Sequence, residues 1–525
     1  MEGRFIFMEH NLAQTQNVTI AALAIFALIM VCIGVYAVIR TKTIDGFLLG
    51  NRNIGPWVSA FAYGTSYFSA VVFVGYAGQH GWNIGLGSIW IGIGNAVLGC
   101  LVAWWLLAKR TRTITHNLQT KTMPEFFEKR YSSTSMKIFA AIVIFVFLVP
   151  YSSAVYNGLG NMFKAIFPDV SVNTWMLVIA VLTGIYLVLG GYVATAYTDF
   201  VQGIIMIVGV FAMIIALVKT DAVGGFGHMI ENLRAIPDNG DGITGAQLTS
   251  WYGGKSFQFL CYNIMLTSFG TWGLPQMVQK YYAIKDTKSI KQATIISTAF
   301  ALIIGCGAYL NGSLSRLVLN NQMPESGVDN VIPQTLLTAF GNGNMVTTVI
   351  LAMLLILLLS ASMSTLSSIV LTSASAISVD LLPTVKKNMK EGNQVITTRV
   401  LCLVFVALSY VFATMKISII VNLMSFSWGI VSGSFIGPYI WGIYSKKITK
   451  AGAWAGMLCG FLTIALTSVI IAVANGNIAA AAKLTPQMGV AAMAISLTVT
   501  PIVSAFTKKY DDAFVEKVFT VKEGL

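Results

Sequence analysis

Long apolar stretches alternate with short polar tracts along almost the whole chain. Because about 20 apolar residues at a rise of about 1.5 Å cross the hydrocarbon core of a bilayer, each stretch predicts a transmembrane helix. The pattern therefore predicts an all-α polytopic membrane protein with about thirteen transmembrane helices. They lie near residues 18–39, 56–79, 85–108, 138–165, 174–190, 196–218, 256–283, 292–318, 344–382, 396–415, 417–444, 451–474 and 487–506.

The composition agrees with this pattern. Of the 525 residues, 56% are hydrophobic and 10% are charged, whereas about 25% are charged in an ordinary soluble domain. The net charge of +13 comes from short tracts between the apolar stretches, which do not form the basic stripe of a nucleic-acid-binding surface. We therefore exclude a soluble fold and a nucleic-acid partner. The stretch 18–39 is too long for a signal-peptide core and is expected to be retained, while Met1 and Met8 both stay open as the start.

The basic residues predict the orientation of the chain. If the N-terminus lies outside, the cytoplasmic connections hold 25 of the 33 basic residues, including the tracts 109–137 and 280–291. The other eight fall at the outer face: Arg4, Lys164, Lys219, Arg234, Lys255, Arg316, Lys416 and Lys483. Because Lys and Arg are enriched on the cytoplasmic side, we expect a multi-pass protein of the plasma membrane with its C-terminus in the cytoplasm.

Glycine and polar residues interrupt two of the predicted helices, at 62–78 and 263–276. Each interrupted helix opens a run of five spans, 56–218 and 256–444, and two runs with an odd number of spans have opposite orientations. This pattern is typical of a five-plus-five inverted repeat, in which broken helices bind solute and coupling ion near the midplane. Close packing of helices through small residues is the alternative explanation of the glycines.

The same division predicts the organisation of the chain. Residues 1–45 would form a span outside the core, 46–219 the first repeat, 220–255 an extracellular loop, 256–445 the second repeat, and 446–525 two further spans and a cytoplasmic tail.

Two polar features lie within apolar stretches. Asp199 is the only acidic residue that we assign well within the membrane, where a carboxylate needs a cation or a hydrogen-bond donor, although with Thr198 and Gln202 it could instead cap a helix N-terminus. The segment 361–368 carries five hydroxyls, some of which share one helix face. Hydroxyl oxygens suit a sodium ion, but serine and threonine also bond back to their own helix.

These motifs together resemble the sodium:solute symporter family, which includes proline, pantothenate, sugar, iodide and monocarboxylate carriers. The resemblance covers roughly residues 40–510. The motifs that carry it are the broken helix 64–78, the segment 189–192 with Thr198, Asp199 and Gln202, the turn 273–276, and the hydroxyl segment 361–368.

The resemblance implies the residues of the sites. The coupling sodium would bind backbone oxygens of Thr65, Phe68 and Ala361 and the hydroxyls of Ser364 and Thr365. A second sodium would bind Asp199, Ser367 and Ser368, or these groups would form a hydrogen-bond network. The solute would lie among Tyr67, Ser69, Gln79, Tyr151, Tyr156, Trp272, Gln276, Ser425 and Trp428, each of which could instead be a packing residue.

The sequence and the family resemblance indicate the class of solute only in part. Thr267 and Thr271 stand where the proline carriers have aromatic residues, which argues against proline. No lysine or arginine is assigned to the solute site, so the charged contacts of the sugar carriers have no counterpart. The turn 273–275 is more like that of the pantothenate and monocarboxylate carriers. We favour a small carboxylate held by amides and hydroxyls, with amino acids, pantothenate and uncharged solutes left open.

Other classes of function find little support. The segment 253–256 lacks the first glycine of a P-loop, since Thr249 stands at that position. The four histidines, at positions 10, 80, 116 and 228, have no metal-ligand spacing. We therefore predict that the chain is no enzyme but a secondary symporter that imports a small organic solute with Na+ by alternating access. A proton-coupled carrier, a channel-like member and a proline-type carrier are the alternatives.

Overall fold

The computed structural model describes residues 2–38, 43–341, 344–385 and 390–520. Within these ranges every regular element is a helix, and one isolated bridge pairs Ile54 with Ile284. Ten of the described helical segments are long and apolar enough to cross a membrane, and the interrupted helices add shorter segments. The structure thus confirms the all-α membrane-spanning fold, whereas the number of thirteen spans stays a prediction.

Both predicted interruptions are real breaks. The first lies between α3 (Pro56–Tyr67) and the helical segment Val71–Tyr76 that continues into α4 (Ala77–Ile84), and Phe68 is extended there, with φ −105° and ψ 114°. The second lies between α12 (Phe257–Gly273) and α13 (Pro275–Ala283), where Leu274 is extended. Proline lacks the backbone N–H that would continue α12, but it fits the first position of a new helix. A local sequence signal therefore sets the position of the second break.

The long helix α9 (Val172–Val218) joins two of the predicted spans. It bends at Gly191, whose φ of 54° and ψ of −144° suit only a glycine. A Cβ atom at this position would also lie 2.6 Å from the backbone oxygen of Phe47. Asp199 follows the bend by eight residues and is therefore in a helix interior. The alternative that Asp199 caps a helix N-terminus is wrong, because the N-terminus predicted near residue 196 does not exist.

Four further long helices surround the breaks: α8 (Thr134–Ile166), α14 (Thr287–Val318), α16 (Met345–Ser375) and α19 (Ile420–Tyr444). Glycines let α14 approach the first broken helix closely, since a Cβ atom on Gly81 would lie 2.1 Å from the backbone of Gly312. This contact fixes the position of α4 without a side chain between the two helices.

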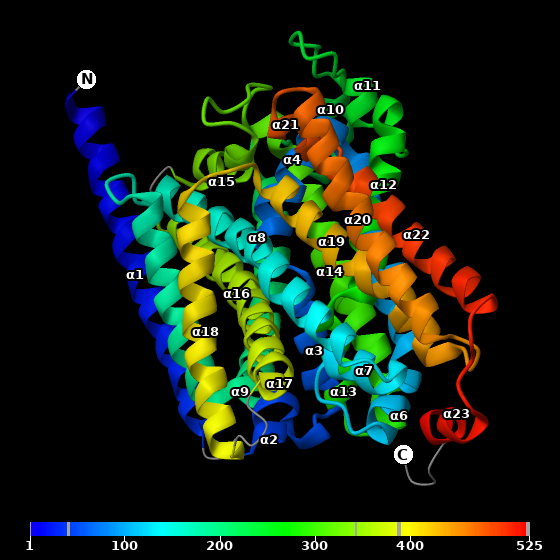
Figure 1. Cartoon of the computed structure of the whole chain (residues 1–525). Helices are drawn as coiled ribbons and strands as arrows, with labels where there is room; N and C mark the ends of the chain where they lie inside the picture. The colour runs from blue at the N-terminus through cyan, green and yellow to red at the C-terminus, as the bar shows by residue number, and fades with distance from the viewer. Residues whose placement is uncertain (1, 39–42, 342–343, 386–389, 521–525) are drawn as a thin grey trace.

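The remaining helices lie outside this group. α1 (Glu2–Val38) runs along α9 and α16, whereas α20 (Lys450–Ala474) and α22 (Thr485–Ala505) pack against α19 (Figure 1). The other helices are α2 (Ile44–Leu49), α5 (Ile89–Gly94), α6 (Lys109–Asn117), α7 (Met123–Tyr131), α10 (Gly225–Arg234), α11 (Gly245–Leu248), α15 (Val331–Phe340), α17 (Leu382–Val385), α18 (Glu391–Thr414), α21 (Ile478–Lys483) and α23 (Asp512–Phe519).

The two ends of the helix bundle carry different connections. α10, α11 and α15 lie at the end near the N-terminus, whereas α6, α7 and α23 lie at the opposite end with the C-terminus (Figure 1). Along the sides, large apolar residues are exposed, such as Ile25 and Leu28 on α1 and Val473 on α20. Exposed apolar side chains over the length of a helix fit contact with lipid chains. The bundle therefore has the shape of a membrane protein with its termini at opposite faces.

Candidate functional site

The end of α3 meets the hydroxyl segment of α16 at the first break. The hydroxyl of Ser364 lies 3.0 Å from the carbonyl oxygen of Thr65, and the hydroxyl of Thr365 lies 3.3 Å from the carbonyl oxygens of both Thr65 and Ser66. The last carbonyls of a helix have no N–H partner within it. α3 ends at Tyr67, so these two carbonyls are directed at α16 instead of at a further turn.

The same two hydroxyls also reach back to their own helix. The carbonyl oxygen of Ala361 lies 3.0 Å from the Ser364 hydroxyl and 3.1 Å from the Thr365 hydroxyl. We call Thr65, Ser66, Ala361, Ser364 and Thr365 the carbonyl–hydroxyl cluster; all five residues are buried, with at most 2% of their surface exposed. It contains four of the five predicted ligands of the coupling sodium and adds the carbonyl of Ser66, which the sequence did not single out.

The chemistry of this cluster suits a small hard cation. Its atoms are three carbonyl oxygens and two hydroxyl oxygens, and hard cations prefer oxygen ligands. A hydroxyl can turn its proton away and present a lone pair to an ion. Phe68, the fifth predicted ligand, is the extended residue at the break, three residues after Thr65.

A second polar group contains an unexpected lysine. Lys280 was assigned to a cytoplasmic tract, but only 1% of its side chain is exposed, and its ammonium nitrogen lies 3.8 Å from a carboxylate oxygen of the fully buried Asp199. The assignment fails because α13 continues the span beyond the break as far as Ala283 and carries Lys280 with it. Lys285, Lys288 and Lys291 of the same tract are exposed, as expected.

The ammonium group of Lys280 also contacts the hydroxyl helix. Its nitrogen donates to the hydroxyl of Ser368 at 3.1 Å and lies 5.0 Å above the ring of Tyr192. We call Asp199, Lys280, Ser368 and Tyr192 the lysine cluster. Of the three residues expected around a second sodium, Asp199 and Ser368 therefore meet through Lys280. Ser367 does not join them, because its hydroxyl donates to the carbonyl of Ser364 within α16.

The two clusters are connected through serine hydroxyls. The hydroxyl of Ser66 lies 2.7 Å from that of Ser368, and the carbonyl of the same Ser66 belongs to the carbonyl–hydroxyl cluster. A continuous path of polar contacts therefore runs from Asp199 through Lys280 to the end of α3. The sequence did contain a signal for it, since Lys280 falls inside the predicted span 256–283.

Three aromatic residues lie next to the carbonyl–hydroxyl cluster. The ring of Trp428 is centred 6.0 Å from the ring of Tyr67 and 5.7 Å from that of Tyr151, which it meets edge to face. Each is 1% exposed. The hydroxyl of Tyr67 donates to the carbonyl of Thr267 at 2.6 Å. The Tyr151 hydroxyl faces the side chains of Ser69 and Trp428, but neither it nor the Trp428 indole N–H makes a hydrogen bond of full geometry among the described residues. Buried donors without partners are rare and call for a ligand or water. We call these three residues the aromatic cluster.

The other predicted solute residues are more scattered. Ser69 lies at the first break and accepts a hydrogen bond from the Val71 amide, and the hydroxyl of Ser425 bonds that of Tyr76 at 2.8 Å. Trp272 packs against Phe269 and donates to the Leu98 carbonyl, which are contacts of a structural residue. The side chains with an unpaired buried oxygen are those of Gln79 on α4, Tyr156 on α8 and Gln276 on α13.

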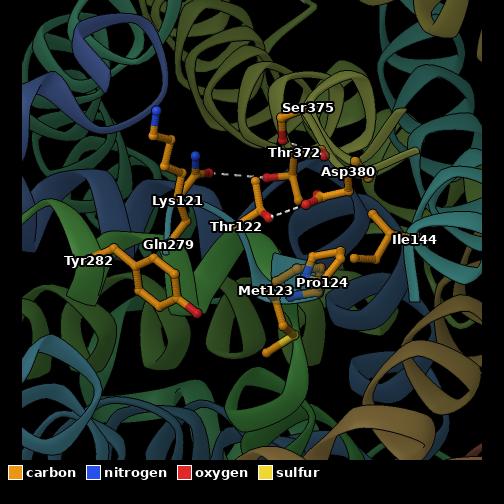
Figure 2. Close-up of a pocket in the computed structure, with 12 residues that line it drawn as sticks. Lys121, Thr122, Met123, Pro124, Ile144, Gln279, Tyr282, Thr372, Ser375 and Asp380 are labelled. Carbon is orange, nitrogen blue, oxygen red and sulfur yellow. Dashed lines mark hydrogen bonds between the residues drawn. The ribbon is translucent and has the colours of Figure 1, made fainter. Parts of the chain in front are cut away.

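Below the lysine cluster, α16 leads to a small cavity of about 10 Å³, enough for about one water molecule. Figure 2 shows Thr372 hydrogen-bonded to Gln279 and Thr122 to Asp380, at 3.2 and 2.7 Å. Asp380 is fully buried, so Asp199 is not the only carboxylate within the apolar helices as the sequence suggested. The helix continues as far as Val385 without a polar tract, which explains why Asp380 stays inside. These contacts close the bundle at the end that carries α7.

The sequence is similar to a known family and to several named transporters. The sequence model of the sodium:solute symporter family matches residues 47–460. The high-affinity proline transporter PutP of Bacillus subtilis is 29% identical over 83% of this chain and 89% of its own length. The sodium/proline symporter of Escherichia coli is 28% identical over 83% and 84%, and that of Staphylococcus aureus (strain JH9) 27% over 95% and 94%.

Solved structures show the same fold at low identity. A Na+-coupled sialic acid symporter in a substrate-bound, outward-open state has a TM-score of 0.74 at 16% identity and covers 94% of this chain and 99% of its own. The nucleobase-cation-symport-1 family transporter Mhp1, closed around bromovinylhydantoin, has a TM-score of 0.54 at 13% identity, with 91% and 98% covered. At these identities the likeness concerns the fold alone.

Proposed function

We propose that this chain, which belongs to the sodium:solute symporter family, imports a small carboxylate-bearing solute across the plasma membrane together with sodium. Support for sodium-coupled symport comes from the family and from the relatives that are named sodium/proline symporters. The observation that carries the sodium site is the convergence of the Thr65 and Ser66 carbonyls with the hydroxyls of Ser364 and Thr365.

Sodium in the carbonyl–hydroxyl cluster would couple to the solute through α3. The ion would join the end of α3 to α16 and so hold the break in one conformation. Tyr67 directly follows Ser66 and contacts Trp428 in the aromatic cluster. A ligand that fixes a mobile segment lowers the ordering cost for the next ligand. Sodium binding therefore prepares the solute site, and its loss to the cytoplasm releases it.

The aromatic cluster supports the proposed solute class. The Trp428 indole N–H and the Tyr151 hydroxyl are buried donors that face each other without a hydrogen bond of full geometry among the described residues, and a carboxylate can accept hydrogen bonds from both. The three rings would pack against an apolar body of the solute. A charged side chain is absent from this cluster, so the solute's carboxylate would be held by neutral donors.

An amino acid of the proline type is the second candidate solute. Three relatives at 27 to 29% identity are named as proline carriers. Against it stands the position of Thr267 and Thr271, whose hydroxyls bond the Asn95 side chain and the Ser268 carbonyl. Both hydroxyls are thus engaged within the protein.

The first experiment is to identify the solute by thermal shift. Purified protein is screened with proline, other amino acids, monocarboxylates and pantothenate, in sodium chloride and in choline chloride at equal ionic strength. A ligand that binds only the folded state raises its apparent stability. We expect a carboxylate to raise the melting temperature in sodium and much less in choline.

The second experiment tests the ion site in proteoliposomes. Ser364→Ala and Thr365→Ala each remove one hydroxyl, and a bond to a charged group contributes about 1.5–3 kcal/mol, so the sodium concentration for half-maximal uptake should rise about 10- to 100-fold. Ser373→Ala is the control, because Ser373 is a buried hydroxyl of the same helix without a hydrogen-bond partner. Unchanged sodium dependence in both test variants would refute the assignment.

A further inference from the structure

The lysine cluster joins four helices around one ammonium group. Lys280 reaches from α13 toward Asp199 and Tyr192 on α9 and toward Ser368 on α16, and Ser368 in turn contacts Ser66 on α3. All of these side chains are buried, with at most 3% of their surface exposed. The arrangement is therefore part of the buried core of the bundle and not of its surface.

A buried ammonium group needs a compensating charge. Moving a lone ion out of water is costly, and a carboxylate nearby offsets the cost only if hydrogen bonds satisfy the rest of the group. Asp199 supplies the charge at 3.8 Å, Ser368 accepts a hydrogen bond, and the Tyr192 ring faces the cation. Neither carboxylate oxygen of Asp199 has a hydrogen bond among the described residues, so the nearby ammonium group is what offsets its charge. The lysine therefore fits its surroundings as a resident positive charge.

Without the lysine, the same surroundings would suit a metal ion. The Asp199 carboxylate, the Ser368 hydroxyl and the Ser66 hydroxyl form a set of oxygen ligands with one negative charge. A cation brought to about 4 Å from the ammonium group would meet a repulsion that weakens its binding roughly a thousandfold. Ammonium and sodium therefore exclude each other at this position.

We propose that the Lys280 ammonium group permanently fills the position of a second coupling cation, so that this carrier binds one sodium ion and not two. The inference rests on the proposed sodium site in the carbonyl–hydroxyl cluster. Lys280 is a positioning residue: it holds α9, α13 and α16 around Ser368 in every step of the cycle, where a bound ion would leave.

The connection to α3 gives the fixed charge a role in coupling. Ser368 bonds Ser66, whose carbonyl accepts from Thr365 in the carbonyl–hydroxyl cluster. With a second sodium ion at this position, the ordering of α3 would also depend on how far sodium fills this second site. A tethered ammonium group supplies the same contacts at any sodium concentration. The sodium dependence of the wild-type protein should therefore be that of a single site.

The test measures sodium binding directly, with radioactive sodium as the only ligand and choline as the replacement ion. Purified wild-type protein should bind one sodium ion with a Hill coefficient of about 1. Lys280→Met keeps the length of the side chain but leaves the Asp199 carboxylate without its partner. This variant should bind a second sodium ion per protein molecule, and it should require sodium for its thermal stability.

Two control variants separate this role from a merely structural ion pair. Lys280→Arg keeps a cation and should still bind one sodium ion. The double variant Lys280→Met with Asp199→Asn removes both charges, so it should fold and again bind one sodium ion. A structural pair predicts the same single ion in Lys280→Met as in the double variant.

Each other outcome contradicts the proposal. Two sodium ions bound to the wild-type protein would overturn it, and so would a folded Lys280→Met that still binds one. A Lys280→Met that stays unfolded in high sodium would overturn it too, because the ion should replace the lost charge. Failure of the proposed function gives a different result, because then neither the wild-type protein nor any of the variants would bind sodium.

Discussion

Gly270 packs against the indole of Trp428, so a substitution at Gly270 would displace a ring of the aromatic cluster. A Cβ atom at Gly270 would lie 2.8 Å from Cε3 and 3.4 Å from Cζ3 of that ring. Carbon atoms pack best at about 3.5–4.0 Å. Gly270→Ala should therefore displace the indole by roughly 1 Å and disturb its contacts with Tyr67 and Tyr151.

The size of the effect follows from this displacement. Overpacking of a filled core costs about 1–3 kcal/mol, and alanine in place of a helical glycine returns about 0.5–1 kcal/mol. The free energy of unfolding should thus fall by no more than about 2.5 kcal/mol. The loss of one well-placed hydrogen bond from the indole N–H to a charged carboxylate costs about 1.5–3 kcal/mol, so solute affinity should fall about 10- to 100-fold.

The assay compares the solute-induced and the sodium-induced thermal shifts of the same variant. Sodium binding should stay close to that of the wild type, because the carbonyl–hydroxyl cluster has no contact with Gly270 among its hydrogen bonds. Gly392→Ala is the control, since a Cβ atom there meets nothing within 4 Å. A folded Gly270→Ala with normal solute affinity would refute the placement of the solute beside Trp428.

Two further predictions concern the surface of the protein. Single cysteines in the tracts 109–137 and 220–255 should be labelled by an impermeant thiol reagent from opposite sides of the membrane, and labelling from one side only would contradict the orientation. In the connection after α14, burial raises the pKa of Asp329 to about 6, although the Ile420 amide opposes the rise. The carboxyl therefore stabilises the fold below about pH 4, and this contribution is lost as the pH rises through about 6. The side chain at this position stays neutral in the Asp329→Asn variant. Between about pH 5 and about pH 7.5 the free energy of unfolding of the variant should therefore rise by on the order of 1 kcal/mol relative to that of the wild type. Thermal unfolding of both proteins at both pH values measures this difference, and a difference that does not change with pH would exclude the titration.

Features that depend on neighbouring residues can be predicted from the amino-acid sequence. Apolar length predicts the spans because the bilayer fixes how many residues are needed to cross it. Pro275 predicts the second break because its missing N–H acts within one helical turn. The spacing of hydroxyls on α16 predicts a polar face, since all of them belong to one helix. Four of the five ligands that the family resemblance implies do converge in the structure, although the binding of sodium there stays a prediction.

The positions of the buried charges, in contrast, depend on how helices that are distant in the sequence pack together. Lys280 belongs to a basic tract that is otherwise exposed, and Asp199 has the sequence surroundings of a helix cap. Their meeting depends on the bend of α9 at Gly191, on the length of α13 after the break, and on the packing of both against α16. Such contacts join residues 81 positions apart in the chain, so no local pattern encodes them. Burial of a charge requires a compensating partner, and here that partner lies on another helix that is close only in the folded bundle.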